Sequence, residues 1–164
     1  MNLKTRIEDI DIFQIIRDLA GIHNIETYVI GGFVRDLIID RNSKQDIDIV
    51  CLGSGIHLAQ ILKKHLGDSA SLAIYKQFGT ACVKYQKLEI EFVGARKESY
   101  RSESRKPIVE EGTLEEDQNR RDFTINALAI SLNEKDFGEL TDPFDGITDA
   151  KRKSIKTPLD PEET

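Results

Sequence analysis

Two aspartates separated by a single residue are the most chemically suggestive feature of the sequence. They lie in the segment DIDIV at positions 46 to 50, where carboxylates alternate with β-branched apolar side chains. This period of two is typical of a half-buried strand, and it predicts that Asp46 and Asp48 share one face, with Ile47 and Ile49 on the other. At about 6 Å and an effective dielectric constant of about 20, the carboxylates repel each other by roughly 3 kcal/mol. A fold that keeps both needs something to offset this repulsion.

A second strand pattern supplies further carboxylates. In LEIEFV, Glu89 and Glu91 fall on one face, and Ile90 and Phe92 on the other. Two carboxylates on one strand and a third from a neighbouring strand suit a pair of Mg²⁺ ions, about 3.5 to 4 Å apart, that hold a reacting phosphoryl group. On these residues alone, either glutamate could complete the set. The alternative is an exposed edge strand with solvated aspartates.

A pair of glycines ahead of the aspartates suggests where a phosphate could bind. Gly31 and Gly32 follow the strand-like run TYVI and precede the helical pattern FVRDLIID. Glycines at such a junction allow close approach of the backbone and leave N–H groups for an anion, to which Arg35 would add a cation. A plain tight turn is the alternative, since the segment lacks the GxGxxG dinucleotide motif.

The first half of the sequence predicts the elements that position these residues. Helical spacing indicates helices in segments 7–22, where Gly21 can end the helix, and 57–66, which Gly67 closes. Alternating patterns predict strands at 27–30, 46–52, 79–85 and 88–94, the last two as an antiparallel hairpin.

The second half opens with a charged loop over residues 95–112. Thr113 then begins the pattern TLEE, a capping box that predicts a helix over residues 115–121. The segment 122–132 changes from helix-like to strand-like spacing, and DPFDG is a turn whose Asp145 could cap one more short helix.

The composition favours a single soluble domain. With 164 residues, of which 39% are hydrophobic, the chain can bury one core but is too short to promise two. No apolar run approaches the ~18 residues of a membrane helix, and charges interrupt the N-terminal segment. We therefore expect a cytoplasmic protein without a signal peptide or a membrane partner. Cys51 and Cys82 lie in strand-like runs and are expected to be reduced core thiols.

The net charge of −6 argues against a broad basic surface for nucleic acid, although a local patch can still bind a polyanion. One such patch is RKESYRSESRK at residues 96–106, where five basic residues against two acidic ones give +3. A solvated flexible loop is the simpler interpretation of this segment.

The motifs GGFVRD, DID, RRDFTINALA and DPFDG, in this order and at these intervals, closely resemble the catalytic head of class II tRNA nucleotidyltransferases. This group includes the CCA-adding enzymes and bacterial poly(A) polymerases, within the DNA polymerase beta-like nucleotidyltransferase superfamily. The resemblance covers residues 25–163. It implies an α/β (α+β) fold with a small mixed sheet flanked by helices, a catalytic head at 1–155, and the start of a linker at 156–164.

The resemblance also implies roles for single residues. Asp46 and Asp48 match the aspartates that ligate both catalytic Mg²⁺ ions, and Glu91 matches the carboxylate that completes the site, so it is favoured over Glu89. The nucleotide-binding residues that it implies are Gly31, Gly32, Arg35, Arg120, Arg121, Asp122 and Asn126. In the family, the RRD motif binds the ribose and the triphosphate of the nucleotide. This fits the residue types, because a guanidinium can pair with phosphate and a carboxylate can accept a hydrogen bond from a ribose hydroxyl. An ordinary surface ion pair is the alternative for this motif. The loop at 95–112 resembles the mobile catalytic loop of the family.

The implied function is nucleotidyl transfer. CMP and AMP, from CTP and ATP, would be added to the 3′ end of tRNA by two-Mg²⁺ chemistry. Two alternatives remain: a poly(A) polymerase acting on another RNA 3′ end, and a non-catalytic module that binds nucleotide or RNA. Family members continue into neck, body and tail domains, and an EDxxR motif in the neck selects the base. The sequence ends at PEET, where that region should begin, so we expect a C-terminally truncated chain that binds RNA weakly.

Overall fold

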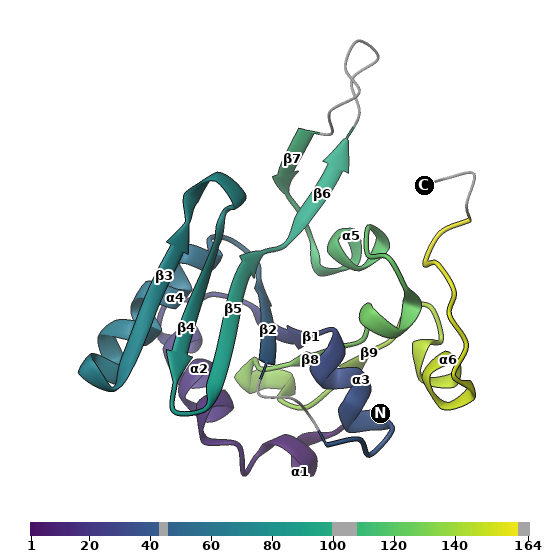
Figure 1. Cartoon of the computed structure of the whole chain (residues 1–164), viewed down its shortest axis with the longest axis horizontal. Helices are drawn as coiled ribbons and strands as arrows, with labels where there is room; N and C mark the ends of the chain where they lie inside the picture. The colour runs from purple at the N-terminus through teal and green to yellow at the C-terminus, as the bar shows by residue number, and fades with distance from the viewer. Residues whose placement is uncertain (43–45, 100–107, 161–164) are drawn as a thin grey trace.

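The computed structural model describes residues 1–42, 46–99 and 108–160, and a mixed sheet lies at the centre of this part of the chain (Figure 1). In chain order, the strands of the sheet are β1 (Thr27–Ile30), β2 (Asp46–Cys51), β3 (Ala70–Tyr75), β4 (Thr80–Tyr85), β5 (Leu88–Gly94), β8 (Ala129–Ser131) and β9 (Leu140–Thr141). Their order across the sheet is β3-β4-β5-β2-β1-β8-β9, with β2 and β5 parallel and the other neighbours antiparallel. A separate antiparallel pair consists of β6 (Arg96–Ser99) and β7 (Ile108–Glu111).

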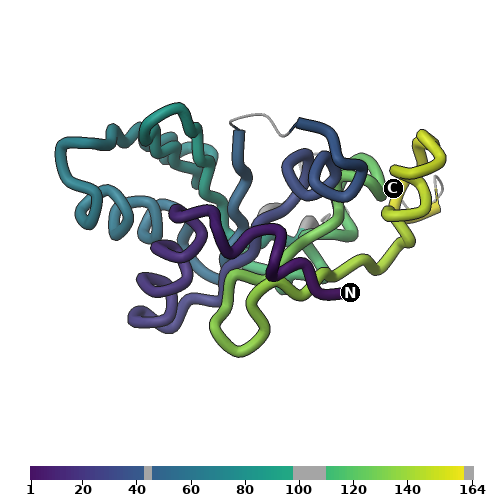
Figure 2. The backbone as a smooth tube through the Cα atoms, turned by 90° about the horizontal axis from the view of Figure 1, so that it is seen from below, coloured from purple at the N-terminus to yellow at the C-terminus, as the bar shows by residue number. Residues whose placement is uncertain are grey.

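The helices surround this sheet. They are α1 (Lys4–Ile7), α2 (Asp11–Ile22), α3 (Gly32–Ile38), α4 (Gly55–Leu66), α5 (Leu114–Asn119) and α6 (Gly146–Arg152), and one of the 3₁₀ turns is Thr124–Asn126. The β3–β4 hairpin and α6 lie at opposite ends of the molecule (Figure 1, Figure 2). The expected mixed sheet flanked by helices is confirmed. Within the described residues, no helix has the length and apolar character needed to span a bilayer.

One face of the sheet carries the main hydrophobic core. Helices α2 and α4 pack behind this face in Figure 1. Alternate residues of the central strands are buried there, among them Ile47, Ile49, Val83, Ile90 and Phe92. Burial of a side chain of this size contributes about 1.5–3 kcal/mol, so the pairing that buries the whole set is strongly preferred. The same alternation turns Asp46 and Asp48 to the opposite face, as predicted.

The opposite face is covered over part of its area by a smaller apolar cluster. This cluster consists of Tyr28, Ile30, Val50, Ala95 and Ala129, with Leu114 of α5 packed against it. The remaining part, which we call the open face, is formed by outward-facing residues of four strands that are exposed or partly exposed. They are Ser71, Ala73 and Tyr75 of β3, Thr80, Cys82 and Lys84 of β4, Glu89 and Glu91 of β5, and Asp46 and Asp48 of β2.

The N-terminal helix differs from the sequence prediction. The predicted single helix is split into α1 and α2, and Gly21 lies inside α2 instead of ending it. Ile7 and Ile12 are both buried in the main core. In one continuous helix these two residues would point about 140° apart, since each residue turns the helix by about 100°. The extended backbone at Ile10 breaks the helix and allows both side chains to reach the core.

Two other segments also depart from the prediction. No strand was predicted at residues 70–75, but this segment forms β3, the edge strand of the sheet beside β4. The predicted charged loop carries β6 and β7 at its two ends. Residues 100–107, on which the expectation of a mobile or solvated loop falls, lie outside the described residues.

The helix after this loop begins as predicted. Thr113 Oγ1 accepts a hydrogen bond from the Glu116 N–H, and Glu116 Oε2 accepts one from the Thr113 N–H at 2.8 Å, which completes the capping box. Helix α5 then ends at Asn119, before the two arginines, instead of continuing through Arg121. The arginines therefore lie at the helix end, where their side chains can turn toward the sheet.

Asp142 caps α6 in place of Asp145. The Asp142 carboxylate accepts hydrogen bonds from the backbone N–H groups of Gly146, at 2.7 Å, and Ile147, at 3.0 Å. Asp145 has a left-handed backbone with φ of 56° and accepts a hydrogen bond from the Thr148 hydroxyl. The predicted turn and short helix are present, but the capping residue differs because Asp145 adopts the turn conformation that aspartate tolerates.

The two cysteines have different environments. Both are free thiols, but Cys51 is fully buried whereas Cys82 is only partly buried on the open face. Burial raises the pKa of Cys51 to about 12. Burial also raises the pKa of Cys82, and the nearby Glu89 carboxylate adds to this shift. The expectation of a core thiol therefore holds for Cys51 and not for Cys82.

Candidate active site

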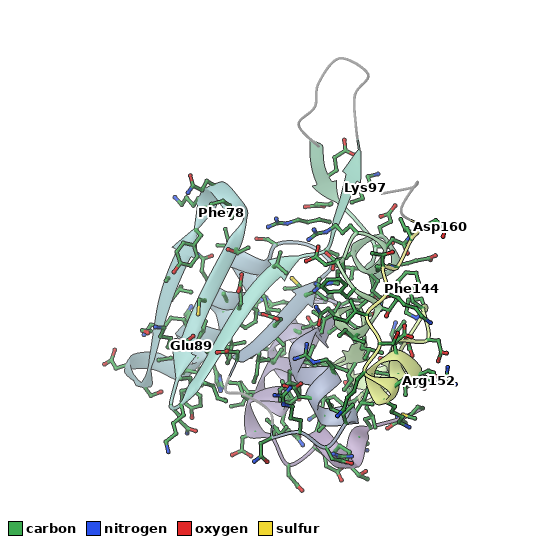
Figure 3. All side chains as sticks on the ribbon, turned by 45° about the vertical axis from the view of Figure 1, so that its right-hand side comes forward. Phe78, Glu89, Lys97, Phe144, Arg152 and Asp160 are labelled. Atoms are coloured by element: carbon green, nitrogen blue, oxygen red, sulfur yellow. The ribbon has the colours of Figure 1, made fainter. Side chains whose placement is uncertain are left out.

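Strand pairing brings the predicted carboxylates together at one end of the open face. The parallel pairing of β2 and β5 puts Glu91 beside Asp48 and Glu89 beside Asp46. Glu89, labelled on β5 in Figure 3, forms an ion pair with Lys84 of β4, with 3.1 Å between Oε1 and Nζ. Neighbouring strands lie about 4.8 Å apart, so paired side chains on one face are adjacent. The register puts one glutamate beside each aspartate, and the ion pair of Glu89 with Lys84 favours Glu91 as the third carboxylate of the site.

These carboxylates crowd one another electrostatically. The pKa of Asp48 is raised, mainly by burial. The Arg121 guanidinium partly lowers this pKa, and the negative charge of Asp46 raises it further. Burial likewise raises the pKa of Glu91, the charge of Asp48 adds to it, and Arg96 opposes it. Since partial burial and like charges both disfavour the ionised carboxylates, a cation placed among them would be bound favourably.

The donor set fits a hard divalent cation. Carboxylate oxygens are the ligands that Mg²⁺ prefers in proteins. Across 1–42, 46–99 and 108–160, no three Asp, Glu, His or Cys side chains are gathered closely enough to form a ready-made metal site. Asp46, Asp48 and Glu91 nevertheless share one face of two adjacent strands, with Glu91 directly beside Asp48.

A polar pocket of about 330 Å³ adjoins Asp48. It is lined by residues from three separate segments, namely Gly31, Gly32, Asp48, Arg120, Arg121, Asp122 and Asn126. The fold thus gathers nearly all of the predicted nucleotide-binding residues beside one of the predicted metal-binding aspartates. Glycine backbone at the pocket wall together with guanidinium groups suits a phosphate-bearing ligand.

Gly31 shapes the wall of this pocket. Its φ of +81° is a conformation that L side chains rarely adopt, which explains the need for glycine after β1. A Cβ at this position would lie 3.4 Å from Asp48 Oδ2 and 4.0 Å from Arg121 Nη1. The glycine therefore leaves space between a carboxylate and a guanidinium, where a ligand can approach the backbone closely.

Arg35 is not among the residues that line this pocket, but its Nη2 would lie 3.3 Å from a Cβ on Gly32, which does line it, so its expected role as a cation of the site stays a prediction. Its Nη1 donates to Asn126 Oδ1 at 3.1 Å, and its Nε donates to the buried Asp36 carboxylate at 3.0 Å. These bonds tie α3 to the 3₁₀ turn that carries Asn126. In this arrangement Arg35 positions Asn126, which does reach the pocket.

Asp117 is a residue of the site that sequence reasoning missed. Its fully buried carboxylate accepts from Arg121 Nε at 3.0 Å and Nη2 at 2.9 Å, and it pairs with Arg120 Nε at 3.4 Å. It also accepts from the Arg96 backbone N–H at 3.1 Å. One carboxylate thus orients both pocket arginines and the start of β6. Its position three and four residues before the arginines is a signal that could have revealed this role.

The 3₁₀ turn Thr124–Asn126 is supported by the segment around α6. The Thr124 hydroxyl donates to Asp149 Oδ2 at 2.7 Å, and Lys156 Nζ lies 3.1 Å from Asp149 Oδ1. Gly146 packs so closely that a Cβ there would lie 2.5 Å from the Thr124 carbonyl oxygen. The DPFDG segment therefore has the architectural role predicted for it, since it fixes the turn that presents Asn126.

Comparison with known proteins places this arrangement in a family. A sequence profile described as the poly A polymerase head domain matches residues 27–156. The chain is 42% identical over 132 residues to an A-adding tRNA nucleotidyltransferase of Aquifex aeolicus, which covers 80% of this chain and 16% of that protein.

Solved structures agree with this match. A CCA-adding enzyme in apo form II superposes with a TM-score of 0.85 at 35% identity, covering 97% of this chain and 38% of that one. A tRNA nucleotidyltransferase complexed with a primer tRNA and an incoming ATP analog gives a TM-score of 0.74 at 38% identity, covering 88% of this chain and 39% of that one. The chain therefore spans less than half the length of each of these relatives. With the profile matching most of its length and the same motifs lining one pocket, the chain belongs to the poly(A) polymerase head-domain family of nucleotidyltransferases.

Proposed function

We propose that the chain is the catalytic head of a tRNA nucleotidyltransferase. In the reaction, the 3′-hydroxyl oxygen of an RNA forms a bond to the α-phosphorus of a nucleoside triphosphate. The bond to the β-phosphate breaks, pyrophosphate leaves, and the hydroxyl proton is released. The observation that carries the proposal is the strand register that sets Asp48 beside Glu91, next to a pocket lined by glycine backbone and two arginines.

The protein contributes mainly binding and orientation. Arg120 and Arg121, both held by Asp117, face the triphosphate, and Gly31 allows its oxygens to reach the backbone. Asp122 and Asn126 accept or donate hydrogen bonds at the ribose. In a phosphoryl transfer, such positioning and charge stabilisation account for most of the catalysis.

Asp46, Asp48 and Glu91 would hold Mg²⁺. When bound, ions of this kind activate the attacking hydroxyl and neutralise charge on the departing pyrophosphate. The crowding of carboxylates that raises the pKa values of Asp48 and Glu91 supports this assignment.

The proposed substrates are ATP and CTP, with a tRNA 3′ end as acceptor. The names of the relatives, an A-adding tRNA nucleotidyltransferase and a CCA-adding enzyme, support a tRNA acceptor. Poly(A) addition is the second candidate, because the matching profile is named after poly(A) polymerases. A non-catalytic nucleotide-binding module is less well supported, since binding alone does not require three carboxylates on adjacent strands.

The test is a titration of ATP, and separately CTP, with and without Mg²⁺. We expect Mg²⁺ to tighten nucleotide binding to the native chain and to have no such effect on the Asp46→Ala, Asp48→Ala double variant. Glu89→Ala is the matched control, because Glu89 is on the same face but pairs with Lys84. Unchanged metal-dependent affinity in the double variant would rule out the assignment.

A further inference from the structure

The polar pocket of the candidate site is assembled from segments that lie far apart in the sequence. Gly31 and Gly32 follow β1, residues 120–122 follow α5, and Asn126 ends a 3₁₀ turn. We call residues 120–122 the arginine wall and the turn Thr124–Asn126 the asparagine wall. A ligand that contacts both walls binds well only if their separation is fixed, since a binding site requires a precision of about 0.5 Å. The contacts that fix this separation therefore determine how well the ligand fits.

The asparagine wall is tied to the glycines. The Gly31 backbone N–H donates to the carbonyl oxygen of Leu128, two residues after Asn126, at 3.2 Å. Arg35 of α3 donates to the Asn126 side chain at 3.1 Å. These bonds fix the asparagine wall relative to β1 and α3. Neither of them reaches the arginine wall.

The arginine wall depends on the position of a short helix. Helix α5 has six residues, which is fewer than two turns, and a helix of this length is not stable by itself. Tertiary contacts must therefore hold it. Leu114 packs on the smaller apolar cluster at the start of the helix, and Asp117 accepts a hydrogen bond from the Arg96 backbone. Neither contact joins the helix to the asparagine wall.

Gln118 supplies this connection. The residue is 1% exposed, and its Nε2 donates to the carbonyl oxygens of Ala127, at 2.7 Å, and of Thr141 in β9, at 3.4 Å. Ala127 directly follows Asn126. The carbonyl oxygen of Gln118 accepts from the Arg121 backbone N–H at 3.3 Å. One buried residue thus bonds to both sides of the pocket, through its side chain and through its backbone.

The burial of this amide requires an explanation. Glutamine is mostly exposed in folded proteins, and an apolar side chain of similar length would fill the same space without a polar group to satisfy. The amide differs from such a side chain because its hydrogen bonds have a defined length and direction, whereas apolar contact is non-directional. A directional bond from Gln118 holds α5 and the asparagine wall at one separation.

We propose that Gln118 is a positioning residue for nucleotide binding, which sets the separation between the arginine wall and the asparagine wall. It is not among the residues that line the pocket, so it acts through Asn126 and not on the nucleotide itself. The proposal rests on the proposed function, because it takes the ligand to be a nucleoside triphosphate with its phosphates at the arginines and its ribose at Asn126. Loss of the amide then weakens the contact with the ribose more than the contact with the phosphates.

The experiment is a calorimetric titration of the native chain and of Gln118→Met with two probes in the presence of Mg²⁺. One probe is ATP, and the other is tripolyphosphate, which has the phosphates but no ribose. We expect Gln118→Met to weaken ATP binding about tenfold, which corresponds to roughly one well-placed hydrogen bond, and tripolyphosphate binding less than about twofold. Retained tripolyphosphate binding also shows that the variant is folded.

Two further variants separate the positioning role from a loss of stability. Gln118→Asn keeps an amide but shortens the side chain, so it should give the same selective loss of ATP affinity. Thr27→Val is the matched control, because it also removes a buried side-chain hydrogen bond, to the Ile25 carbonyl oxygen at 3.1 Å, at the end of β1 remote from Gly31. It should leave both affinities unchanged.

A double-mutant cycle tests whether Gln118 acts through Asn126. Contacting or coupled residues have non-additive effects, whereas independent ones add. We expect the Gln118→Met, Asn126→Ala double variant to bind ATP within about twofold of Asn126→Ala alone, because the contact that Gln118 positions is already absent. The cycle of Thr27→Val with Asn126→Ala should be additive.

Four results overturn the positioning role. They are an unchanged ATP affinity in Gln118→Met, an equal loss of ATP and tripolyphosphate binding, additive effects in the cycle with Asn126→Ala, and a native chain that binds ATP but not tripolyphosphate. Failure of the proposed function differs from all of these, since it appears as an absence of Mg²⁺-dependent ATP binding in the native chain. A native chain that binds Mg²⁺-ATP and a Gln118→Met variant that binds it equally well would keep the enzyme assignment and remove only the role of Gln118.

Discussion

At the scale of single residues, Asp117 shows how a buried charge can organise a binding site. Its carboxylate is fully buried, yet three partners from three positions satisfy it, namely Arg120, Arg121 and the Arg96 backbone. Long arginine side chains lose considerable conformational entropy when a ligand fixes them. Because Asp117 already holds two guanidinium groups beside the pocket, the triphosphate of the proposed function would lose less of its binding energy to this ordering.

We predict that Asp117→Asn weakens ATP binding about tenfold and lowers the free energy of unfolding by about 1–3 kcal/mol. The substitution keeps the shape but removes the charge that two partly buried arginines require. Calorimetric titration with ATP and urea denaturation measure the two effects. Glu115→Gln, on the exposed surface of the same helix, should change neither. Lost stability with unaltered ATP affinity would reduce Asp117 to a purely structural residue.

Sequence patterns predicted some of these residues better than others. The alternation in DIDIV correctly put Asp46 and Asp48 on one face, because local spacing alone determines it. The preference for Glu91 over Glu89 came from the family resemblance, because alternation puts both glutamates on one face and the strand register puts each of them beside an aspartate. Asp117 was missed because the family motif that was matched begins only at Arg120, three residues later. The bond of Arg35 to Asn126, which lies 91 residues further along the chain, could not be predicted from local spacing.

At the scale of elements, the junction of α4 with β5 is the tightest contact near the carboxylates. A Cβ on Gly94 would lie 2.2 Å from the Gly53 carbonyl oxygen, and one on Gly55 would lie 2.7 Å from the Val93 backbone. Backbone cannot move aside as a flexible side chain can. These glycines therefore allow α4 to begin directly against the end of β5, the strand that carries Glu91.

We predict opposite effects for two glycine substitutions in helices. Gly55→Ala should lower the free energy of unfolding by more than about 2 kcal/mol, since its methyl group overlaps with backbone. Gly21→Ala should raise it by about 0.5–1 kcal/mol, because nothing lies within 4 Å of its Cβ position and α2 gains helix propensity. Urea denaturation of both variants measures the difference. Equal effects of the two substitutions would contradict the tight junction.

Element prediction failed where packing overrides local pattern. The first helix is broken at Ile10 because Ile7 and Ile12 both reach the core, and no spacing rule anticipates such a break. Strand β3 went unassigned because it is an edge strand whose outward residues include Ala73, which blurs the alternation. The capping box at Thr113 and the hairpin of β4 and β5 were predicted correctly, since both depend on residues close in sequence.

At the scale of the whole molecule, the distribution of charge limits how tightly this chain can bind RNA. The net charge is −6, because 29 aspartates and glutamates outnumber 23 lysines and arginines. Each phosphate that a protein neutralises releases counterions, so RNA affinity falls steeply as salt increases. One seven-stranded sheet and a separate two-stranded pair make up the strands of the described residues, and the expected single head domain with its boundary at residue 155 stays a prediction.

We predict that this chain binds a single-stranded RNA with a Kd above about 1 μM at physiological salt, and that binding weakens strongly as salt rises. Fluorescence anisotropy at several salt concentrations gives the slope of log K against log salt. Lys76 is exposed in the turn between β3 and β4, and Lys76→Gln should reduce this slope by about one. Lys135→Gln is the control, because Lys135 is also exposed but pairs with Glu26, away from the open face. Sub-micromolar affinity at physiological salt would contradict the prediction.

The parallel pairing of β2 with β5 also determines the stage of folding at which the proposed metal site forms. The chain between these strands contains α4 and the hairpin of β3 and β4, which can form from contacts near in sequence. The pairing itself joins Asp48 to Glu91 across that whole intervening segment, and such long-range contacts form slowly because the chain must first close a large loop. A molecule that has collapsed but has not completed this pairing has not brought Glu91 beside Asp48. The proposed metal site therefore forms only when this one strand pair closes, and not when the chain collapses.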